Sequence, residues 1–446
     1  LEAGTLTLSG SGTIGAPSGA LTINGGTLLI SPGSGALSTG TLSGSGGTLS
    51  LNDNDTTITQ GSFGLYSGVI SGTGSLTKEG VATLVLAGAN TYSGGTVLNG
   101  GALIGTTDSI QGDITNDAAV TFDQESDGTY SDVISGTGTV TKAGSGVVTL
   151  SGTNTYTGGT VVSAGTLTFS GSGTIGATSG PLTINGGTFA IPSSSGAFSV
   201  GSLIGLSGTL ALNDNDITVT QESSGTYSGV ISGTGSLTKE GASTLTLTGN
   251  NTYSGGTVVT AGVLAGTTVG LQGDIANSAT VTFDQNSDGI YSDIISGTGA
   301  VTKSGSGVVT LSATSTYSGG TTFARGTLAV SDESKLGSGD FSFDGGLLGL
   351  TTTTEVTRPL SLVGNGGIDA DTGTTVTVSG LISGEGAFTK SGSGQVTLTA
   401  ANTYSGGTVV EGGILTTSGS GTIGASSGAL TINGGSFVLS LGSGNV

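Results

Sequence analysis

The chain repeats itself along its length, and this repetition constrains its fold more than any other feature of the sequence. The segment Tyr66–Leu103 returns at Tyr130–Leu167, Tyr227–Leu264 and Tyr291–Leu328, and a shorter copy runs over Leu381–Leu415. A short step, from Tyr66 to Tyr130, thus alternates with a long step, from Tyr130 to Tyr227. Fixed periods are typical of solenoids and arrays, in which each unit buries its apolar face against its neighbours. The usual estimate of about three globular domains from length therefore does not apply.

A higher-order period is superimposed on these steps. One short and one long step together lead from Tyr66 to Tyr227, and we call this distance along the sequence the combined period. The segments that begin at Ala3 and Ala164 show it too, because AGTLTLSGSGTIG and AGTLTFSGSGTIG differ at one position, and a third version starts at Gly412. Residues 329–380 interrupt the regular copies, and we expect them to form variant coils of the same array.

Short alternating runs of apolar and polar residues fill each copy. Examples are TLVL at Thr83–Leu86, VVTL at Val147–Leu150 and TLTL at Thr244–Leu247, and such runs end at Gly, Ser or Asn-Gly. β-branched Thr and Val favour pleated strands, and Gly supplies corners with positive φ. No window shows the apolar spacing of about 3.6 residues that an amphipathic helix requires.

Strands this short cannot bury a face as isolated hairpins, so they must stack on copies of themselves. The short step divides into three coils of about 21 residues, which is the size of a β-helix turn. We predict an all-β chain that forms a single right-handed parallel β-helix of about 20 coils over residues 1–446. At ~4.8 Å per stacked strand, it would be a rod on the order of 100 Å long.

The composition excludes several classes of protein. Gly, at 91 of 446 residues, lies well below the content of collagen, and a mean hydropathy of +0.25 with 8% charged residues is too apolar for a disordered chain. The absence of Cys, His, Met and Trp removes thiolate and imidazole chemistry, including zinc sites. We therefore predict that the protein is not an enzyme, with no catalytic, cofactor-binding or metal-ligating residues and no cofactor.

The charge excludes two kinds of partner. With 8 basic and 28 acidic residues, the net charge of −20 repels nucleic acids and anionic lipid headgroups. No stretch approaches the roughly 18 consecutive apolar residues of a transmembrane helix, so we expect no membrane insertion within these residues. Because the chain starts at Leu1 and stops at Val446 in the middle of its pattern, we expect it to be a window of a longer repetitive protein.

Three glycine motifs satisfy the dinucleotide pattern G-x-G-x-x-G, at Gly10–Gly15, Gly171–Gly176 and Gly419–Gly424. A dinucleotide site also needs a following helix and an acidic residue about 20 positions later. After the first motif no acidic residue occurs until Asp53, and no helical pattern follows. We interpret the motifs as corner glycines.

Acidic turns offer a second candidate chemistry. The segment Asp284–Gly289 reads D-x-N-x-D-G, the front half of a calcium loop, but position 12 is Ile295 where a Glu is required. The related segment Asp123–Gly128 has Glu in place of the Asn. The clusters Asn52–Asp55 and Asn213–Asp216 could hold calcium weakly, although Asx residues also favour turns by bonding their own backbone. We favour the structural interpretation for all four.

Two further features recur in the copies. The box N-T-Y-S-G-G-T, as at Asn251–Thr257, could present Tyr rings to a glycan, but its recurrence favours a structural corner in which Asn bonds the backbone of an adjacent coil. We expect the Lys of a T-K motif to pair with an acidic neighbour or to shield a strand face, and not to act in catalysis. It recurs at Lys78, Lys142, Lys239, Lys303 and Lys390.

Residues 329–380 are the most individual part of the chain. They carry Asp332, Glu333, Lys335, Glu355 and Arg358 around a run of Thr. A lateral contact surface, if the rod has one, is expected first at this place, although a plain set of variant coils is the favoured interpretation.

The repeat resembles the passenger-associated repeat of bacterial autotransporters. The resemblance lies in GTGSLTKEGASTLTLTGNNTYSGGTVVTAGVL at Gly233–Leu264, and the segments Val281–Gly299, Leu328–Gly349 and Thr357–Leu362 are similar as well. It implies a right-handed parallel β-helix at the bacterial outer-membrane surface, outside a Gram-negative-type envelope.

We therefore predict a structural, extracellular β-solenoid rod of a cell-surface adhesin or a matrix- or filament-forming protein. One alternative is a fibre-forming subunit that assembles end to end. A β-helix carbohydrate-active enzyme would need clustered carboxylates, and a calcium- or ice-binding module would use acidic turns or Thr-rich faces such as Thr244–Leu247. The partners considered are further copies of the chain and a host or neighbouring-cell surface or glycan.

Overall fold

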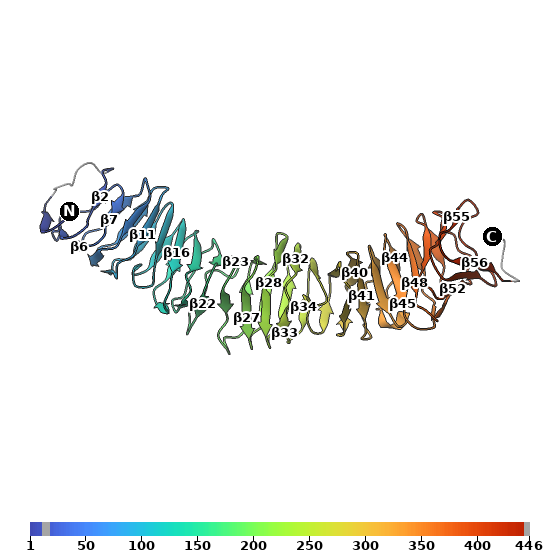
Figure 1. Ribbon diagram of the computed structural model, residues 1–446. Helices are drawn as coiled ribbons and strands as arrows, with labels where there is room; N and C mark the ends of the chain where they lie inside the picture. Colours follow the sequence, from blue (N-terminus) through green and yellow to red (C-terminus); the bar gives the residue numbers. More distant parts are fainter. Residues whose placement is uncertain (11–17, 441–446) are drawn as a thin grey trace. The chain divides into compact units, whose positions relative to one another are not determined.

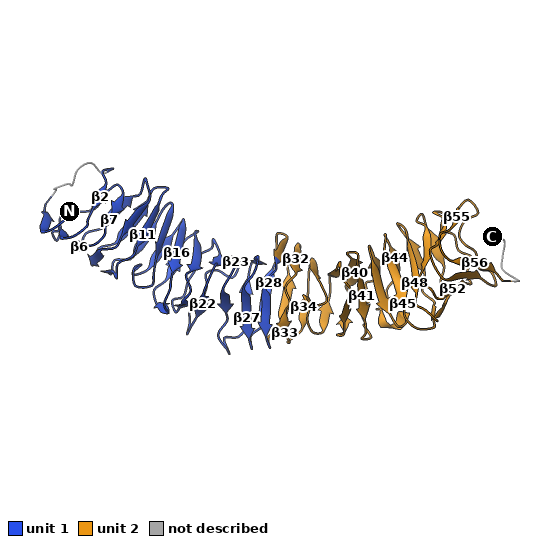
Figure 2. Cartoon of the chain, viewed as in Figure 1, with its two compact units in different colours: residues 1–220, 227–234 blue, residues 221–226, 235–446 orange. Residues whose placement is uncertain are grey.

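The computed structural model describes residues 1–10 and 18–440. These residues form short β-strands and a single short 3-10 helix, η1 (Glu333–Lys335). Two compact units divide them (Figure 2): residues 1–220 with 227–234, and residues 221–226 with 235–446. Within the described residues, no helix has the length and apolar character needed to cross a membrane.

The first unit has two or three strands per coil, and strands of successive coils pair in parallel (Figure 1). The first face contains β8 (Gly64–Tyr66), β11 (Thr83–Leu86), β14 (Ala102–Gly105), β16 (Ala119–Asp123), β19 (Thr139–Ala143), β21 (Thr160–Val162), β23 (Pro181–Ile184) and β26 (Ser202–Ile204). The second begins with β1 (Thr5–Leu8), β3 (Thr27–Ile30), β6 (Thr48–Asn52), β9 (Val69–Gly72) and β12 (Thr91–Tyr92). The third begins with β4 (Leu37–Thr39), β7 (Thr56–Thr59), β10 (Leu76–Glu79), β13 (Thr96–Leu98), β15 (Ile114–Asn116) and β18 (Ile134–Ser135).

The remaining strands of the first unit follow the same scheme. A further sheet contains β17 (Gly128–Tyr130), β20 (Val147–Leu150), β22 (Thr166–Phe169), β24 (Thr188–Ala190), β27 (Thr209–Asn213) and β30 (Val230–Gly233). Two shorter pairs are β2 (Leu21–Thr22) with β5 (Leu42–Ser43), and β25 (Phe198–Val200) with β28 (Ile217–Thr220).

The second unit repeats the scheme with its own parallel sheets. One contains β32 (Thr244–Leu247), β35 (Val263–Gly266), β37 (Thr280–Asp284), β40 (Ala300–Ser304), β42 (Thr321–Phe323), β44 (Phe341–Phe343), β47 (Leu360–Leu362) and β50 (Ile382–Gly384). Another contains β38 (Gly289–Tyr291), β41 (Val308–Leu311), β43 (Thr327–Val330), β45 (Leu347–Leu350), β48 (Gly366–Ala370), β51 (Phe388–Ser391), β53 (Thr408–Val410) and β55 (Leu430–Ile432). Two shorter series are β31 (Leu237–Glu240), β34 (Thr257–Val259), β36 (Ile275–Asn277) and β39 (Ile295–Ser296), and β46 (Thr354–Val356), β49 (Thr375–Val378), β52 (Gln395–Leu398), β54 (Ile414–Thr417) and β56 (Ser436–Leu439).

The predicted fold class is confirmed. The described residues form an all-β parallel β-solenoid of about 21 turns, close to the 20 coils expected. Inward-facing side chains stack on their counterparts one coil later, as in the column Leu84, Leu103, Val120 and Val140, all at most 1% exposed. Burying each such side chain contributes about 1.5–3 kcal/mol, so the interior columns supply the main stabilisation.

The strand register of the first unit shows how many coils separate equivalent residues of two copies. Within the first unit the strand register can be followed from Leu65 in β8 through every coil to Ile204. The next residue, Gly205, pairs with Tyr227. That column runs through Leu65, Val85, Ile104, Thr121, Thr141, Val161, Thr183 and Ile204. Tyr227 therefore lies eight coils after Tyr66, and the combined period is a whole number of coils.

The expectation that the short step makes three coils is wrong. Tyr130 lies in β17 and pairs with Leu150, on a different face from Tyr66 in β8, which pairs with Leu86. The short step thus advances the chain by three coils and one additional face. Each step from one copy to the next spans a whole number of faces. Only a short and a long step together return the sequence to its starting face.

Residues 329–380 continue the parallel pairing of the second unit. Strands β43, β45 and β48 follow one another on one face, and β44 and β47 on another. Helix η1 is inserted between β43 and β44. The individual character of this segment therefore lies in its loops.

Candidate functional site

The five lysines of the repeat copies are buried, at most 1% exposed. In the first copy, Lys78 Nζ donates hydrogen bonds to the carbonyl oxygens of Glu79, Gly80 and Gly100 at 2.8, 2.9 and 2.9 Å. The other four lysines each donate to the carbonyls one, two and 22 residues later. An ammonium group suits this position because it has three donors and no acceptor.

The expected pairing of these lysines with acidic neighbours is wrong. Over residues 1–10 and 18–440, one ion pair forms, between Arg358 and Glu333. Burial lowers the pKa of Lys78, Lys303 and Lys390 to about 8. A pKa near 8 would suit a general base, but each Nζ is enclosed by main-chain carbonyls of its own turn and of the next coil. The lysines therefore tie one coil to the next.

The N-T-Y-S-G-G-T box is a structural corner, as expected. Asn90 Oδ1 accepts from the Ile70 amide at 2.7 Å, and its Nδ2 donates to the Ser109 carbonyl at 2.5 Å, so one amide links three successive coils. Asn154 and Asn402 make the equivalent bonds. Such amides extend the backbone ladder through corners where no strand forms.

The tyrosines of the box do not form a glycan platform. Tyr92 and Tyr253 are at most 2% exposed, and each hydroxyl lies 2.8 Å from the hydroxyl of the Thr four residues later. The same pair recurs in the other three copies at 2.6–2.7 Å. Gly95, with φ of +87°, makes the bend in the conformation that Gly favours. Burial also raises the pKa of Tyr66, the first residue of the first copy, to about 12.

The acidic turns bond to neighbouring coils instead of converging on a common point. Asp288 Oδ1 accepts from the Val308 amide at 2.9 Å, and Asn286 Oδ1 accepts from the Ser306 amide at 3.0 Å. Further bonds of this kind join neighbouring coils in the turn clusters, from Asp55 to Ser75, from Asp127 to Val147 and from Asp214 to Ser194. The described part of the chain holds no group of three His, Cys, Asp or Glu that could bind a metal ion.

The hydrogen bonds also change the acidity of these carboxyls. Bonds from the Ser75 side chain and backbone lower the pKa of Asp55, and bonds from Ser145 do the same for the pKa of Glu125. The turns are thus acceptors for backbone N–H groups at the corners, which are otherwise without strand partners.

Two glycine motifs prove to be corners. Gly171–Gly176 connects β22 to β23, with φ of +61° and +88° at its first and last residue, and Gly419–Gly424 connects β54 to β55 with +62° and +92°. A strand follows each motif where a dinucleotide site needs a helix. Most of the motif at Gly10–Gly15 lies outside the described residues.

The charged cluster in residues 329–380 closes on itself. Arg358 lies 3.8 Å above the ring of Phe341, and its Nε is 3.5 Å from Glu333 Oε2. Its Nη1 donates to the carbonyls of Gly337 and Gly339, so the guanidinium fastens the loop that contains η1 to the next coil. Sequence reasoning identified these residues but not their contacts with one another.

Sequence reasoning missed a cavity of about 460 Å³ in the first unit, lined by Phe169, Phe198 and two polar loops. A signal was present in the combined period, because Leu8 and Leu37 occupy the places of these two Phe residues in the preceding period.

Comparison with known proteins agrees with this picture. Six segments match the model of the family described as passenger-associated-transport-repeat: residues 76–104, 140–169, 164–191, 237–265, 301–330 and 388–417. Five of them begin at the strand that carries the buried lysine, and the sixth covers the second version of the motif at Gly171–Gly176. These segments form an array of passenger-associated transport repeats, here called the passenger array. The resemblance predicted from the sequence is therefore confirmed.

A relative of this passenger array is the Adhesin BmaC autotransporter of Brucella suis biovar 1 (strain 1330). The two are 36% identical over 128 residues, which are 28% of this chain and 4% of the adhesin. No solved structure matches the passenger array. Autotransporter passengers are exposed outside the cell or at the outer-membrane surface, so the predicted localisation is confirmed.

Proposed function

We propose that this passenger array is a non-catalytic, rod-shaped segment of a bacterial surface adhesin, in which residues 1–446 form one continuous β-helix. The observation that carries the proposal is how the recurring polar residues are used. The buried lysines, the box asparagines and tyrosines and the acidic turns all bond to the backbone or side chains of their own coil or an adjacent one. A chain whose recurring polar groups stabilise the stacking of its coils is suited to form an extended rod.

The name of the relative supports the adhesive role. The Brucella protein is called an adhesin, and it shares with this chain a segment of 128 residues. The array would hold adhesive parts of a longer protein away from the cell and meet a host or neighbouring-cell surface. The acidic net charge of −20 would keep neighbouring rods apart.

Electron microscopy and small-angle scattering of the purified chain test the continuous rod. We expect single particles on the order of 100 Å long, from about 20 coils at ~4.8 Å each. Two compact particles joined flexibly would contradict the proposal. Fibres much longer than one chain would support the alternative of a subunit that assembles end to end.

A deletion tests the spacer role in the full-length protein on cells. Removing residues 66–226 takes out eight whole coils, so it should bring an antibody label on the distal end closer to the cell by ~40 Å. The deleted protein must reach the surface in the same amount as the unaltered one. A label that stays at its original distance would rule out a spacer.

A further inference from the structure

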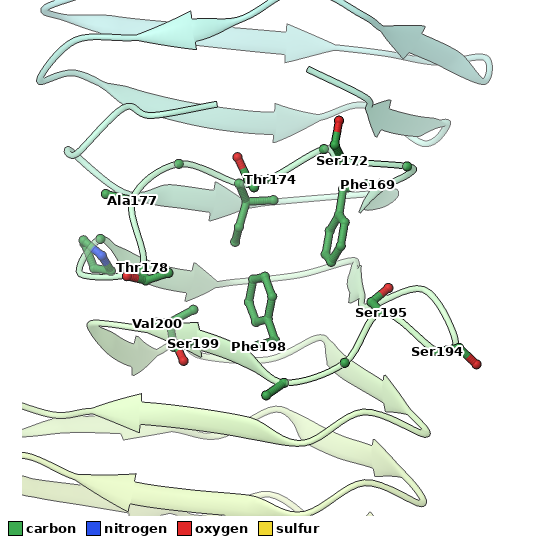
Figure 3. A pocket seen from close by; sticks show the side chains of 18 residues that line it. Phe169, Ser172, Thr174, Ala177, Thr178, Ser194, Ser195, Phe198, Ser199 and Val200 are labelled. Carbon is green, nitrogen blue, oxygen red and sulfur yellow. The ribbon is translucent and has the colours of Figure 1, made fainter. Parts of the chain in front are cut away.

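One corner of the first unit is hollow. The cavity of about 460 Å³, here called the Phe169–Phe198 cavity, lies between the loop that follows β22 and the loop that precedes β25. In Figure 3 the rings of Phe169 and Phe198 point towards one another into the space between these loops. The ring centroids are 5.5 Å apart with planes inclined by 18°, and the buried ring of Phe189 lies 5.5 Å from Phe198.

The rest of the lining is polar but uncharged. Among the 18 residues that surround the cavity, six are Ser or Thr, five are Gly and none is charged. The side-chain hydroxyls of Ser172, Thr178 and Ser199 make no hydrogen bond with the described part of the chain. Thr174 Oγ1 donates to the Asn154 carbonyl at 2.7 Å, so its lone pairs remain available as acceptors.

The repeat does not require this lining. At the equivalent corner of the preceding combined period the chain has Leu8 and Leu37 in place of the two Phe residues, and Gly33 in place of Ser194. Ser194 has φ of +61°, a conformation that favours Gly, and Gly33 adopts it with φ of +70°. These three exchanges add two aromatic rings and a serine to the wall of one cavity. Because the Ser194 hydroxyl is hydrogen-bonded to Asp214 Oδ2 at 3.3 Å, it is the two added rings that point to a ligand.

We propose that the Phe169–Phe198 cavity binds an uncharged sugar ring. Its volume falls in the range of pockets that bind small molecules, about 300–1,000 Å³. The C–H face of a pyranose can pack on an aromatic ring, whose face is electron-rich, while its hydroxyls meet Ser and Thr hydroxyls and the backbone of the glycine loop. This inference does not depend on the rod or on its adhesive role.

The chemistry of the lining selects against two other kinds of ligand. A charged sugar acid would enter a site without a counter-charge, which is unfavourable when the charge loses water. A hydrocarbon would cover hydroxyls without giving them hydrogen-bond partners. A neutral polyhydroxylated ring satisfies both the apolar and the polar part of the lining.

Saturation-transfer NMR on the whole chain tests the proposal with a panel of neutral methyl hexopyranosides and their disaccharides. At least one sugar should bind with a Kd of about 10 mM or lower. Phe198→Leu, which introduces the residue of the sister corner, should weaken binding at least tenfold. Phe323→Leu, at a buried ring in the second unit, serves as the control and should leave the Kd unchanged.

Three results would overturn the assignment. The first is the absence of transfer to every neutral sugar in the panel. The second is equal binding by the unaltered chain and by Phe198→Leu, with the variant shown by circular dichroism to be folded. The third is tighter binding of toluene or of methyl glucuronide than of any neutral sugar, since either would assign the cavity to another class of ligand.

Discussion

Single buried polar residues connect neighbouring coils of the solenoid. Each repeat lysine satisfies three backbone carbonyls, and the box asparagine Asn90 satisfies an amide in the coil before and a carbonyl in the coil after. Buried groups of this kind are costly when a partner is removed, because the remaining carbonyl or amide keeps its desolvation penalty. Their effect on stability should therefore exceed that of an average surface residue.

Replacing a buried lysine tests this contribution directly. We expect Lys303→Met to lower the free energy of unfolding by about 2–4 kcal/mol, because the methionine leaves the carbonyls of Gly305 and Arg325 without the lysine donor and the Ser304 carbonyl with the Gln285 amide alone. Urea unfolding measures the change. Lys335→Met, which loses a single bond to Thr314, is the matched control and should cost less than about 1 kcal/mol. Equal effects of the two substitutions would contradict the tie between coils.

The stability of the fold should depend on alkaline pH in two opposite ways. Burial lowers the pKa of Lys78, Lys303 and Lys390 to about 8, below the usual 10.5, so between these values the unfolded chain binds more protons and stability rises with pH. Burial raises the pKa of Tyr66 to about 12 and raises the pKa of Tyr156 too, so above pH 10 the unfolded chain loses protons first and stability falls.

The urea midpoint should therefore pass through a maximum at about pH 9–10. We expect the rise from pH 8 to be smaller in Lys303→Met, which lacks one of the titrating groups, whereas the fall above pH 10 should persist because the tyrosines are unchanged. A midpoint that declines steadily from pH 7 upwards would show that the lysines do not titrate in this window.

At the scale of strands and coils, the step between two repeat copies is a whole number of faces and not a whole number of coils. A copy can begin on any face, because each coil contacts only the coils before and after it. Removing one short step should therefore preserve every local interface, and the coils after the junction turn by one face.

Deleting residues 66–129 tests this rule. The deletion joins Leu65 to Tyr130, which is equivalent to Tyr66, so we expect cooperative unfolding at an unchanged temperature with an enthalpy lower by about one seventh, the share of residues removed. Calorimetry measures both. Deleting residues 76–129 removes less of the chain but brings Tyr130 to the place where Leu76 pairs with Thr56. This second variant should melt at a clearly lower temperature, and a similar melting temperature for both would refute the rule.

The sequence predicts the class of fold because repetition and strand alternation are local signals. It also predicts the role of the box asparagine, since a residue that recurs at this corner in four of the five copies must serve the corner. It does not predict the face on which each copy starts, because that depends on loop lengths added over many coils. It also does not reveal the lysine ties or the Phe169–Phe198 cavity, because these contacts join residues about one coil or more apart.

At the scale of the whole molecule, charge governs whether chains associate. The sequence has 28 acidic and 8 basic residues and an isoelectric point near 4.1. At neutral pH the net charge of −20 opposes contact between exposed strand edges and the Thr-rich faces of different chains. Acid removes this repulsion before it removes the carboxylates that the fold uses, because hydrogen bonds hold the pKa of Asp55, Glu125 and Asp214 below their usual values.

Lowering the pH to about 4 should therefore make the folded chain associate. Carboxylates with lowered pKa contribute stability that is lost only as pH falls through their folded-state pKa, so circular dichroism should report intact β-structure at about pH 4. Sedimentation velocity should show monomers at neutral pH and larger species in acid, which return to monomers when the pH is raised. Salt at neutral pH should act in the same direction but more weakly, since it screens the charge without removing it. Unfolding that precedes association as the pH falls would mean that aggregation of the unfolded chain, and not loss of repulsion between folded coils, drives assembly.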